Sequence, residues 1–494
     1  MIQQIDYGAV APVLVTALGA VVVLLAGAFE VPGRVLGWLT AGVSLGGLVA
    51  VFVLAGGGVR TTFCIPETLR DGGAASCSYS ADNFTLVFQG IVLAAAALVV
   101  LLSLADLTLA KVPLGEYYFL LLCSVTGALT LVAARDLVLL AVGLETLALP
   151  VFALVALKRY DGRATEAAVK LLLVSVASAA VLLFGISLVY GATGALHFDR
   201  IATAAVTPEL APVLTAGIVL VICGFAFKVA AVPFHAWTPD VYQGAPLPVA
   251  AFLSVVSKAG GFAGLGLVAA LAFPGQGDVW GPLLAVLAAL TMTVGNVLAL
   301  RQTHAVRLLA WSSVAQSGYM LAPLAVGEET VTVAVASMAG YLGFYAVMNL
   351  GAFAVVTGFA DRRQGREGEE GNLLASYRGL ARWSPAEGLA LAFFLICLAG
   401  LPPGIMGLIA KVVVFEAVMT GPVVWLAVVM ALNTVIGLYY YARWAILLFA
   451  PEAEASEGMP RALSFRLALG VTALGAVVLS VLPNLLLHAT LAVG

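Results

Sequence analysis

The chain has 494 residues, of which 62% are hydrophobic and only 10% charged, with a formal net charge of −3 at pH 7 and a mean hydropathy of +1.09. Soluble domains carry about 25% charged residues, so this composition excludes a water-soluble fold, and the absence of basic clusters argues against binding to nucleic acid. The long segments are apolar on every face, which excludes an outer-membrane barrel with its alternating strands. We therefore expect an all-α, polytopic membrane protein.

Polar breaks divide the chain into about fourteen expected membrane spans, since each span needs about 20 apolar residues. The expected spans cover residues 9–29, 35–56, 82–104, 116–134, 137–157, 165–190, 210–232, 247–272, 281–300, 307–326, 331–359, 385–419, 422–448 and 467–489. An even number of spans places both termini on the same side of the membrane. With the termini outside, the inside loops hold fifteen of the 23 cations and the outside loops four, as the positive-inside rule requires. This predicts a multi-pass protein of the bacterial inner (plasma) membrane with both termini on the outer face.

Residues 1–110 are expected to form three N-terminal spans with one outside loop, which contains Cys64 and Cys77. A disulfide is permitted on that side of the membrane, and the sequence leaves open whether one forms. The five cysteines show no spacing typical of a zinc or iron–sulfur site, so we expect no metal site in this chain.

Glu145 is the only acidic residue near the middle of an expected span, and Lys170 on the next span is its candidate partner. An ionisable group at mid-bilayer costs roughly 2.5–3.5 kcal/mol, so such groups need a reason to be there. The pair is either a fixed structural salt bridge or a variable one that controls the proton affinity of Lys228. The sequence does not separate these two interpretations.

Lys228, Lys258 and Lys411 also lie within expected spans, and no acid in the neighbouring spans is positioned to neutralise each of them. Unlike arginine, a desolvated lysine can bind and release a proton under physiological conditions. The three lysines are therefore candidate proton-transfer sites.

Two of these lysines adjoin helix-breaking residues. Pro233 and Pro239 follow Lys228, and Pro402 and Pro403 precede Lys411. Broken helices beside ionisable groups indicate an internal transport site. His235, after the first break, is either a proton relay or a solvated loop residue.

The two breaks fall five spans apart, in spans seven and twelve. This spacing predicts two inverted five-helix repeats, formed by spans 4–8 in residues 111–275 and by spans 9–13 in residues 276–450. Residues 451–494 are expected to hold an inside loop and the last span.

Three stretches resemble the antiporter-like subunits of respiratory complex I and their relatives in multisubunit sodium/proton antiporters and membrane-bound hydrogenases. They are residues 136–156 followed by 166–185, with the glutamate and lysine, residues 227–260, with the first break, and residues 398–411, with the second. Residues 239–246, 295–302, 309–319 and 433–443 are similar to the subunit N branch of that family. Gln316 departs from the pattern, since many relatives have a histidine there, and a water or amide link must replace it.

The resemblance implies a proton-translocating membrane-arm subunit of NADH-quinone oxidoreductase, a translocase. It implies that Glu145 and Lys170 form the coupling pair, Lys228 is the central proton site, Lys258 a relay and Lys411 the site toward the exit. This chain is expected to bind no cofactor; NADH, FMN, iron–sulfur clusters and quinone would belong to partner subunits.

The implied partners are the other membrane-arm subunits, including the neighbouring antiporter-like subunit, together with the lipid bilayer. One alternative is a subunit of a cation/proton antiporter without redox partners. A second alternative is a structural scaffold whose lysines are held by fixed salt bridges.

Overall fold

The structure is a computed structural model that describes residues 5–66, 75–106, 112–157, 161–327, 330–363, 372–451 and 462–491. Within these ranges the chain is helical apart from one two-stranded hairpin. Helices dominate because a backbone in hydrocarbon must satisfy its hydrogen bonds within the segment. Twelve helices of the described part are long and apolar enough to cross a membrane. The prediction of an all-α, polytopic membrane protein is confirmed.

The N-terminal part of the chain, up to Ala202, forms six long helices, a hairpin and a short helix. They are α1 (Ala11–Ala28), α2 (Gly33–Ala55), β1 (Arg60–Cys64), β2 (Cys77–Ala81), α3 (Asn83–Asp106), α4 (Leu114–Val132), α5 (Leu137–Ala156), α6 (Gly162–Thr193) and α7 (Phe198–Ala202). The six long helices lie at the six predicted spans. The hairpin and α7 were not predicted.

The middle of the chain contains the first interrupted helix and two π-helical segments. Its elements are α8 (Ala211–Lys228), α9 (Trp237–Gly244), α10 (Leu247–Phe252), η2 (Leu253–Ser257), α11 (Lys258–Leu267), η3 (Val268–Ala272), η4 (Pro274–Gln276), α12 (Gly277–Ala299), α13 (Ala305–Leu321), η5 (Ala322–Val326) and α14 (Val331–Arg363). Segments α10 to η3 form one continuous span over Leu247–Ala272.

The last part of the chain contains the second interrupted helix. Its elements are η7 (Leu374–Tyr377), α15 (Leu380–Trp383), α16 (Pro385–Ala399), α17 (Ile405–Met419), α18 (Val424–Phe449), α19 (Leu463–Val481) and α20 (Asn484–Leu491). The break between α16 and α17 falls at Gly400–Gly404, where the prolines predicted it.

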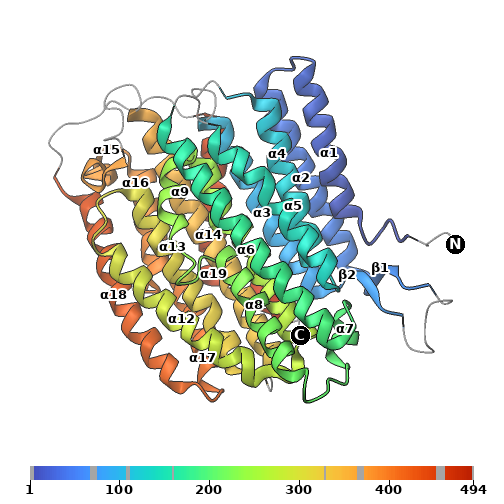
Figure 1. Cartoon of the computed structure of the whole chain (residues 1–494). Coiled ribbons are helices and arrows are strands. Elements are labelled where there is room, and N and C mark those ends of the chain that lie inside the picture. The colour runs from blue at the N-terminus through green and yellow to red at the C-terminus, as the bar shows by residue number, and fades with distance from the viewer. Residues whose placement is uncertain are drawn as a thin grey trace.

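The helices pack into one elongated bundle, with α1, α2 and α4 at one end and α18 at the other (Figure 1). Helix α13 lies inside the bundle, because every one of its residues except Arg307 is buried. Neither α13 nor the α16–α17 pair is among the twelve apolar spans, since α13 is short and polar and the pair is broken. These elements occupy the two remaining ranges in which spans were predicted.

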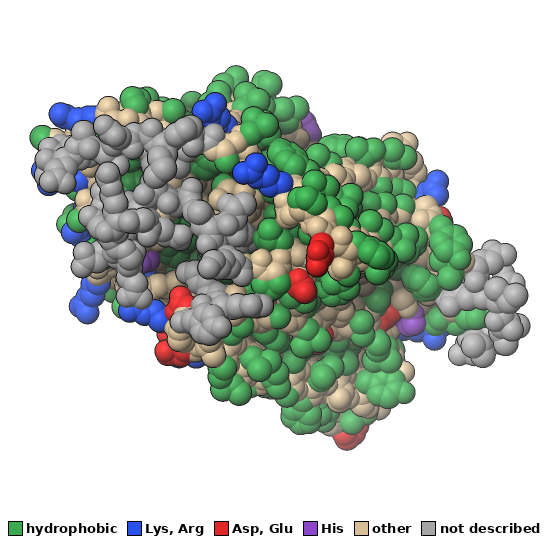
Figure 2. Space-filling model, turned by 90° about the horizontal axis from the view of Figure 1, so that it is seen from above, with side chains coloured by type: hydrophobic (Ala, Val, Ile, Leu, Met, Phe, Trp, Pro, Cys, Tyr) green, Lys and Arg blue, Asp and Glu red, His purple; other side chains and the backbone are tan. Residues whose placement is uncertain are grey.

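The connecting segments lie on two opposite faces of the bundle. On one face the N-terminal segment meets the hairpin, where the backbone N–H of Asp6 donates to the Thr62 hydroxyl at 3.1 Å. On the other face Leu374 donates its backbone N–H to Thr303 at 2.8 Å, and Arg378 binds the Pro451 carbonyl at 2.8 Å. Figure 2 shows Lys and Arg side chains spread over this second face.

Cys64 and Cys77 form a disulfide directly across the hairpin, where they are paired residues of β1 and β2. This answers the question that the sequence left open. The hairpin also pairs with the turn between α4 and α5, through a bridge from Tyr79 to Ala134. It therefore ties the N-terminal helices to the start of α5.

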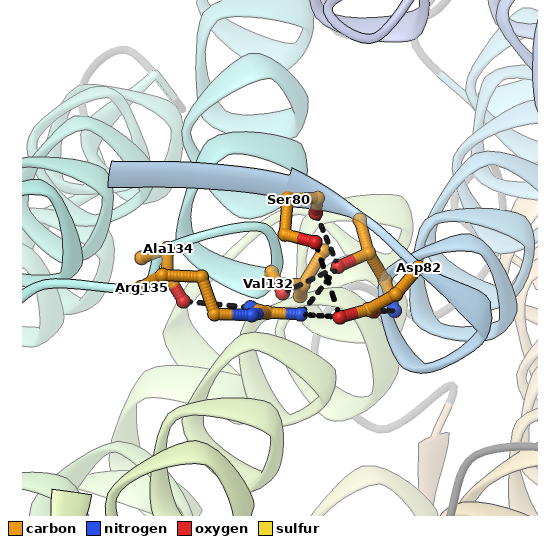
Figure 3. Close-up of polar contacts among 6 residues, drawn as sticks. Ser80, Asp82, Val132, Ala134 and Arg135 are labelled. Atoms are coloured by element: carbon orange, nitrogen blue, oxygen red, sulfur yellow. Dashed lines mark hydrogen bonds and ion pairs between the residues drawn. The ribbon is translucent and has the colours of Figure 1, made fainter. Parts of the chain in front are cut away.

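Arg135 fixes this junction through a compact set of polar contacts (Figure 3). Its guanidinium forms an ion pair with Asp82 and donates to the Ala134 carbonyl at 2.7 Å and to the Thr85 hydroxyl at 3.2 Å. Ser80 donates its hydroxyl to the Asp82 carboxylate at 3.3 Å. Although burial raises the pKa of Asp82, the Arg135 guanidinium more than offsets this and holds the pKa below its ordinary value.

We expect Arg135→Ala to destabilise the hairpin junction by about 1–3 kcal/mol, because it leaves a largely buried carboxylate without its partner. The measurement is the apparent melting temperature of the purified assembly. Arg60→Ala is the matched control, since Arg60 meets Asp6 only at 3.5 Å and its side chain is 49% exposed. Equal melting temperatures for the two variants would contradict the structural role of Arg135.

Candidate functional site

Three of the lysines predicted within spans are buried: Lys228 is 7% exposed, Lys258 1% and Lys411 6%. Among the described residues, no carboxylate lies within ion-pair distance of any of the three. Each lies beside an irregularity in its helix. Lys228 is the last residue of α8, Lys258 follows the π-helical η2, and Lys411 follows the break between α16 and α17.

Lys228 lies at the point where the first broken helix ends. Its ammonium donates to the Ser175 hydroxyl of α6 at 3.3 Å, and Glu145 of α5 is the acidic group whose charge acts on it. Beyond Lys228 the chain turns through Ala230, whose φ is +58°, before α9 begins. The Trp237 indole N–H of α9 donates back to the Phe227 carbonyl at 3.4 Å and so holds the two half-helices together.

Lys170 does not contact Glu145, the partner that the sequence suggested. Its ammonium forms ion pairs with Glu166 at 2.6 Å and with Asp240 at 2.9 Å. Glu166 lies one helical turn before Lys170 on α6, where opposite charges meet readily. Among the described residues, Glu145 forms no ion pair with Lys170 or with Lys228.

Asp240 links Lys170 to a second cation, because Arg307 of α13 binds its other oxygen at 2.9 Å and the Gln243 side chain at 2.9 Å. This ion network joins α6, α9 and α13 and is partly open to solvent, with the Lys170 side chain 43% exposed. Asp240 lies in residues 239–246, one of the stretches that resemble the family, and no partner was predicted for it. Pairing across 70 residues carries no local sequence signal.

Lys258 lies at the centre of the bundle against α13. Its ammonium donates to the Ser317 hydroxyl at 2.7 Å and to the Ser313 carbonyl. The Tyr345 hydroxyl of α14 donates to the Ser313 hydroxyl at 2.7 Å. The π-helical turn before Lys258 adds a residue to the helix and so rotates the lysine relative to an uninterrupted α-helix.

Lys411 caps the end of the half-helix that precedes it. Its ammonium donates to the Ala399 carbonyl, the last of α16, at 2.7 Å, and lies 5.1 Å from the centre of the Tyr319 ring. The negative end of the α16 dipole and the face of an aromatic ring both favour a cation. Gly400 makes this approach possible, because its φ is +78° and an added Cβ would lie 2.8 Å from the Lys411 side chain.

Buried polar side chains of α13 connect the surroundings of Lys258 and Lys411. Gln316 donates to the Leu398 carbonyl at 3.2 Å and to the Tyr441 hydroxyl at 3.1 Å, and it accepts a hydrogen bond from Tyr341. Ser312 in turn binds the Tyr441 hydroxyl. Through its amide, Gln316 therefore joins α13 to α14, α16 and α18. Its contacts show that it also binds a carbonyl near the end of α16.

His235 lies in the break between α8 and α9 and is half-buried. Its ring packs 5.4 Å from Trp311, and its Nδ1 has no hydrogen-bond partner among the described residues. No hydrogen bond in the described part of the chain joins it to a lysine. The described residues also contain no group of three or more His, Cys, Asp or Glu side chains that could hold a metal ion.

Interrupted helices around buried lysines define a membrane-embedded transport subunit. Residues 134–437 match the family described as NADH:quinone oxidoreductase/Mrp antiporter, TM. The chain therefore belongs to this family of membrane subunits.

Within the family, the chain is similar to subunit N of NADH-quinone oxidoreductase. It is 52% identical over 477 residues to NADH-quinone oxidoreductase subunit N 2 of Streptomyces griseus subsp. griseus, covering 94% of this chain and 87% of that protein.

Solved structures share the fold over almost the whole chain. A chain of respiratory complex I from Thermus thermophilus is 30% identical with a TM-score of 0.77, covering 98% of this chain and all of that one. A chain of the Mrp complex from Dietzia sp. is 19% identical with a TM-score of 0.83, covering 98% and 96%. The second likeness shows the fold alone.

Proposed function

We propose that this chain is the N subunit of a bacterial NADH-quinone oxidoreductase and moves protons across the inner membrane while partner subunits transfer electrons from NADH to quinone. The observation that carries the proposal is the set of three buried lysines, each beside a helix interruption and each bound to a buried hydroxyl or carbonyl group. The 52% identity to a protein of that name supports the choice of subunit.

In this proposal Lys228 is the central proton site. Its surroundings offer one hydroxyl and the charge of Glu145, so a small displacement of either changes how readily the ammonium gives up its proton. Lys170 acts at the end of the path near the membrane surface, where its ammonium can change partners between Glu166 and Asp240. Movement of this partly exposed network alters the position of α9, which adjoins the break after Lys228.

Lys258 relays the proton from Lys228, and Lys411 passes it toward the exit. The hydroxyls of Ser313 and Ser317 and the amide of Gln316 lie between these two lysines on α13. Hydroxyl groups both donate and accept hydrogen bonds, so they can order a chain of water molecules for proton transfer. His235 is proposed as a relay at the break, since its Nδ1 is buried there without a hydrogen-bond partner among the described residues.

The two halves of the path are proposed to belong to two inverted repeats of residues 111–275 and 276–450, within fourteen spans in all. The placement of a broken helix in each half, α8–α9 and α16–α17, supports this division. Both termini are proposed to face the outside. The proximity of the N-terminal segment to the disulfide hairpin and the distribution of cations support that orientation.

Co-purification tests the proposal directly. The tagged chain, extracted in mild detergent, should carry with it NADH oxidation activity and the absorbance of flavin and iron–sulfur centres. An intact assembly of membrane proteins that lacks all three would overturn the redox assignment and favour a cation/proton antiporter subunit.

Gln316→Leu is expected to lower the pumping rate by about tenfold or more without loss of the assembled complex, because the leucine cannot bind Leu398, Tyr341 or Tyr441. Gln316→Glu keeps the shape and one acceptor, and it should retain more activity. Pumping is measured as acidification of inverted membrane vesicles on addition of NADH. Equal pumping in Gln316→Leu and the unaltered protein would remove Gln316 from the path.

A further inference from the structure

An apolar groove with a volume of about 480 Å³ lies between α2 and α3 on one side and α14, α19 and α20 on the other. Its walls include Phe52, Leu86, Ile91, Val347, Leu479 and Leu486. Among the lining residues only Asn83, at the start of α3, has a polar side chain. The groove is separate from the lysines and from the polar network of α13.

The groove opens sideways toward the bilayer, since Phe52 on its rim is 69% exposed. Four of its five helices are among the apolar spans, so its surroundings are hydrocarbon. Water does not fill an apolar cavity of this kind, because it would find no hydrogen-bond partners there. The occupant must itself be apolar.

The volume and length of the groove fit a single hydrocarbon chain. An apolar cavity of about 150 Å³ holds benzene, with six carbons, so a volume of 480 Å³ accommodates on the order of twenty carbons. The lining residues of α3 run from Asn83 to Leu98, a length of about 22 Å at 1.5 Å per residue. A helix about 10 Å wide over that length has a volume of roughly 1,700 Å³, more than three times that of the groove, so the groove cannot enclose one.

We propose that this groove binds one acyl chain of a membrane phospholipid, with the headgroup at the Asn83 end. Asn83 directly follows the hairpin and Asp82, so the polar end of the groove lies at the face where headgroups meet water. The acyl chain supplies the packing that the apolar walls otherwise lack and joins the N-terminal helices to α14 and α19.

Two glycines offer a matched pair of variants. Gly90 lines the groove, and a Cβ added there meets no atom within 4 Å, so a leucine can extend into the space reserved for the acyl chain. Gly42 on α2 is equally open but does not line the groove. Both substitutions add the same hydrocarbon surface to a helix in the bilayer.

The assembled complex carrying Gly90→Leu or Gly42→Leu is purified in mild detergent, and its bound phospholipid is counted by native mass spectrometry. Gly90→Leu should lose one phospholipid per complex, while Gly42→Leu should retain the number found in the unaltered protein. Identical numbers in all three, or the same loss in both variants, would overturn the proposal.

A second measurement uses the unaltered chain, so that it does not depend on folding of a variant. Phosphatidylethanolamine with a photoreactive diazirine in one acyl chain is incorporated into membranes containing the complex and irradiated. Crosslinks to the peptide of residues 86–98 are expected. Absence of these crosslinks would overturn the assignment to a phospholipid.

Discussion

Lys228→Ala is expected to reduce NADH-driven proton pumping on the order of 10²-fold and to slow the coupled oxidation of NADH. The buried ammonium is the only titratable group at the end of α8, and its contacts are the Ser175 hydroxyl and the field of Glu145. An alanine side chain cannot bind a proton, so no proton-binding side chain remains at this position beside Ser175. Pumping is measured in inverted membrane vesicles, with the amount of assembled complex determined by native electrophoresis.

Lys228→Arg is the matched control, because it keeps the positive charge but does not release a proton under physiological conditions. If Lys228 acts by proton exchange, both variants lose pumping. If the lysine only supplies a fixed charge, arginine restores activity. Full coupled activity in the alanine variant would exclude Lys228 from the proton path.

The spans could be predicted from the sequence because membrane insertion depends on the length and polarity of each segment alone. The breaks after Lys228 and before Lys411 could be predicted because proline inside a helix removes a backbone hydrogen bond, although α5 continues through a single proline, Pro150. Both features are local, and the observed bounds of α8, α16 and α17 lie close to the predicted ones. Burial of the three lysines could be predicted from local sequence as well, because each lies within an apolar span.

The partners of the charged groups could not be predicted, because they depend on how distant helices are rotated against each other. Lys170 had a plausible partner in Glu145 on the preceding helix, yet it pairs with Glu166 on its own helix and with Asp240 on α9. The hairpin escaped prediction for a similar reason. Its strands are five residues each and are stabilised by a disulfide and by contacts with the turn at Ala134, which no periodicity reveals.

The contacts of helix α13 could be predicted only in part. Its serines, Gln316 and Tyr319 are polar residues of an expected span, and polar residues there either line a water chain or tie helices together. In the structure these side chains tie helices together, since Ser317 binds Lys258 while Gln316 binds Leu398 near the end of α16. A helix that is buried on all sides has no face toward lipid. The positions of its polar residues in the sequence therefore do not show which neighbouring helix each of them contacts.

Lys411→Ala is expected to abolish pumping as fully as Lys228→Ala, although Lys411 belongs to the other broken helix. If the lysines act in series, loss of the last one blocks net transfer even with Lys228 intact. The variant also removes the cation from the Ala399 carbonyl and from the Tyr319 ring. The measurement is again acidification of inverted vesicles, compared at equal amounts of assembled complex.

Two variants of Tyr319 test how much its aromatic ring contributes to stabilising the charge of Lys411. A ring facing an ammonium stabilises the cation by about 0.5–2 kcal/mol, and Tyr319→Phe keeps this ring while Tyr319→Leu removes it. Both variants lose the hydroxyl contacts with Met430 and Thr434, so any difference between them reports on the ring that faces Lys411. We expect pumping to be nearly retained in the phenylalanine variant and several-fold lower in the leucine variant. Equal activities would show that Lys411 depends on the Ala399 carbonyl and the end of α16 alone.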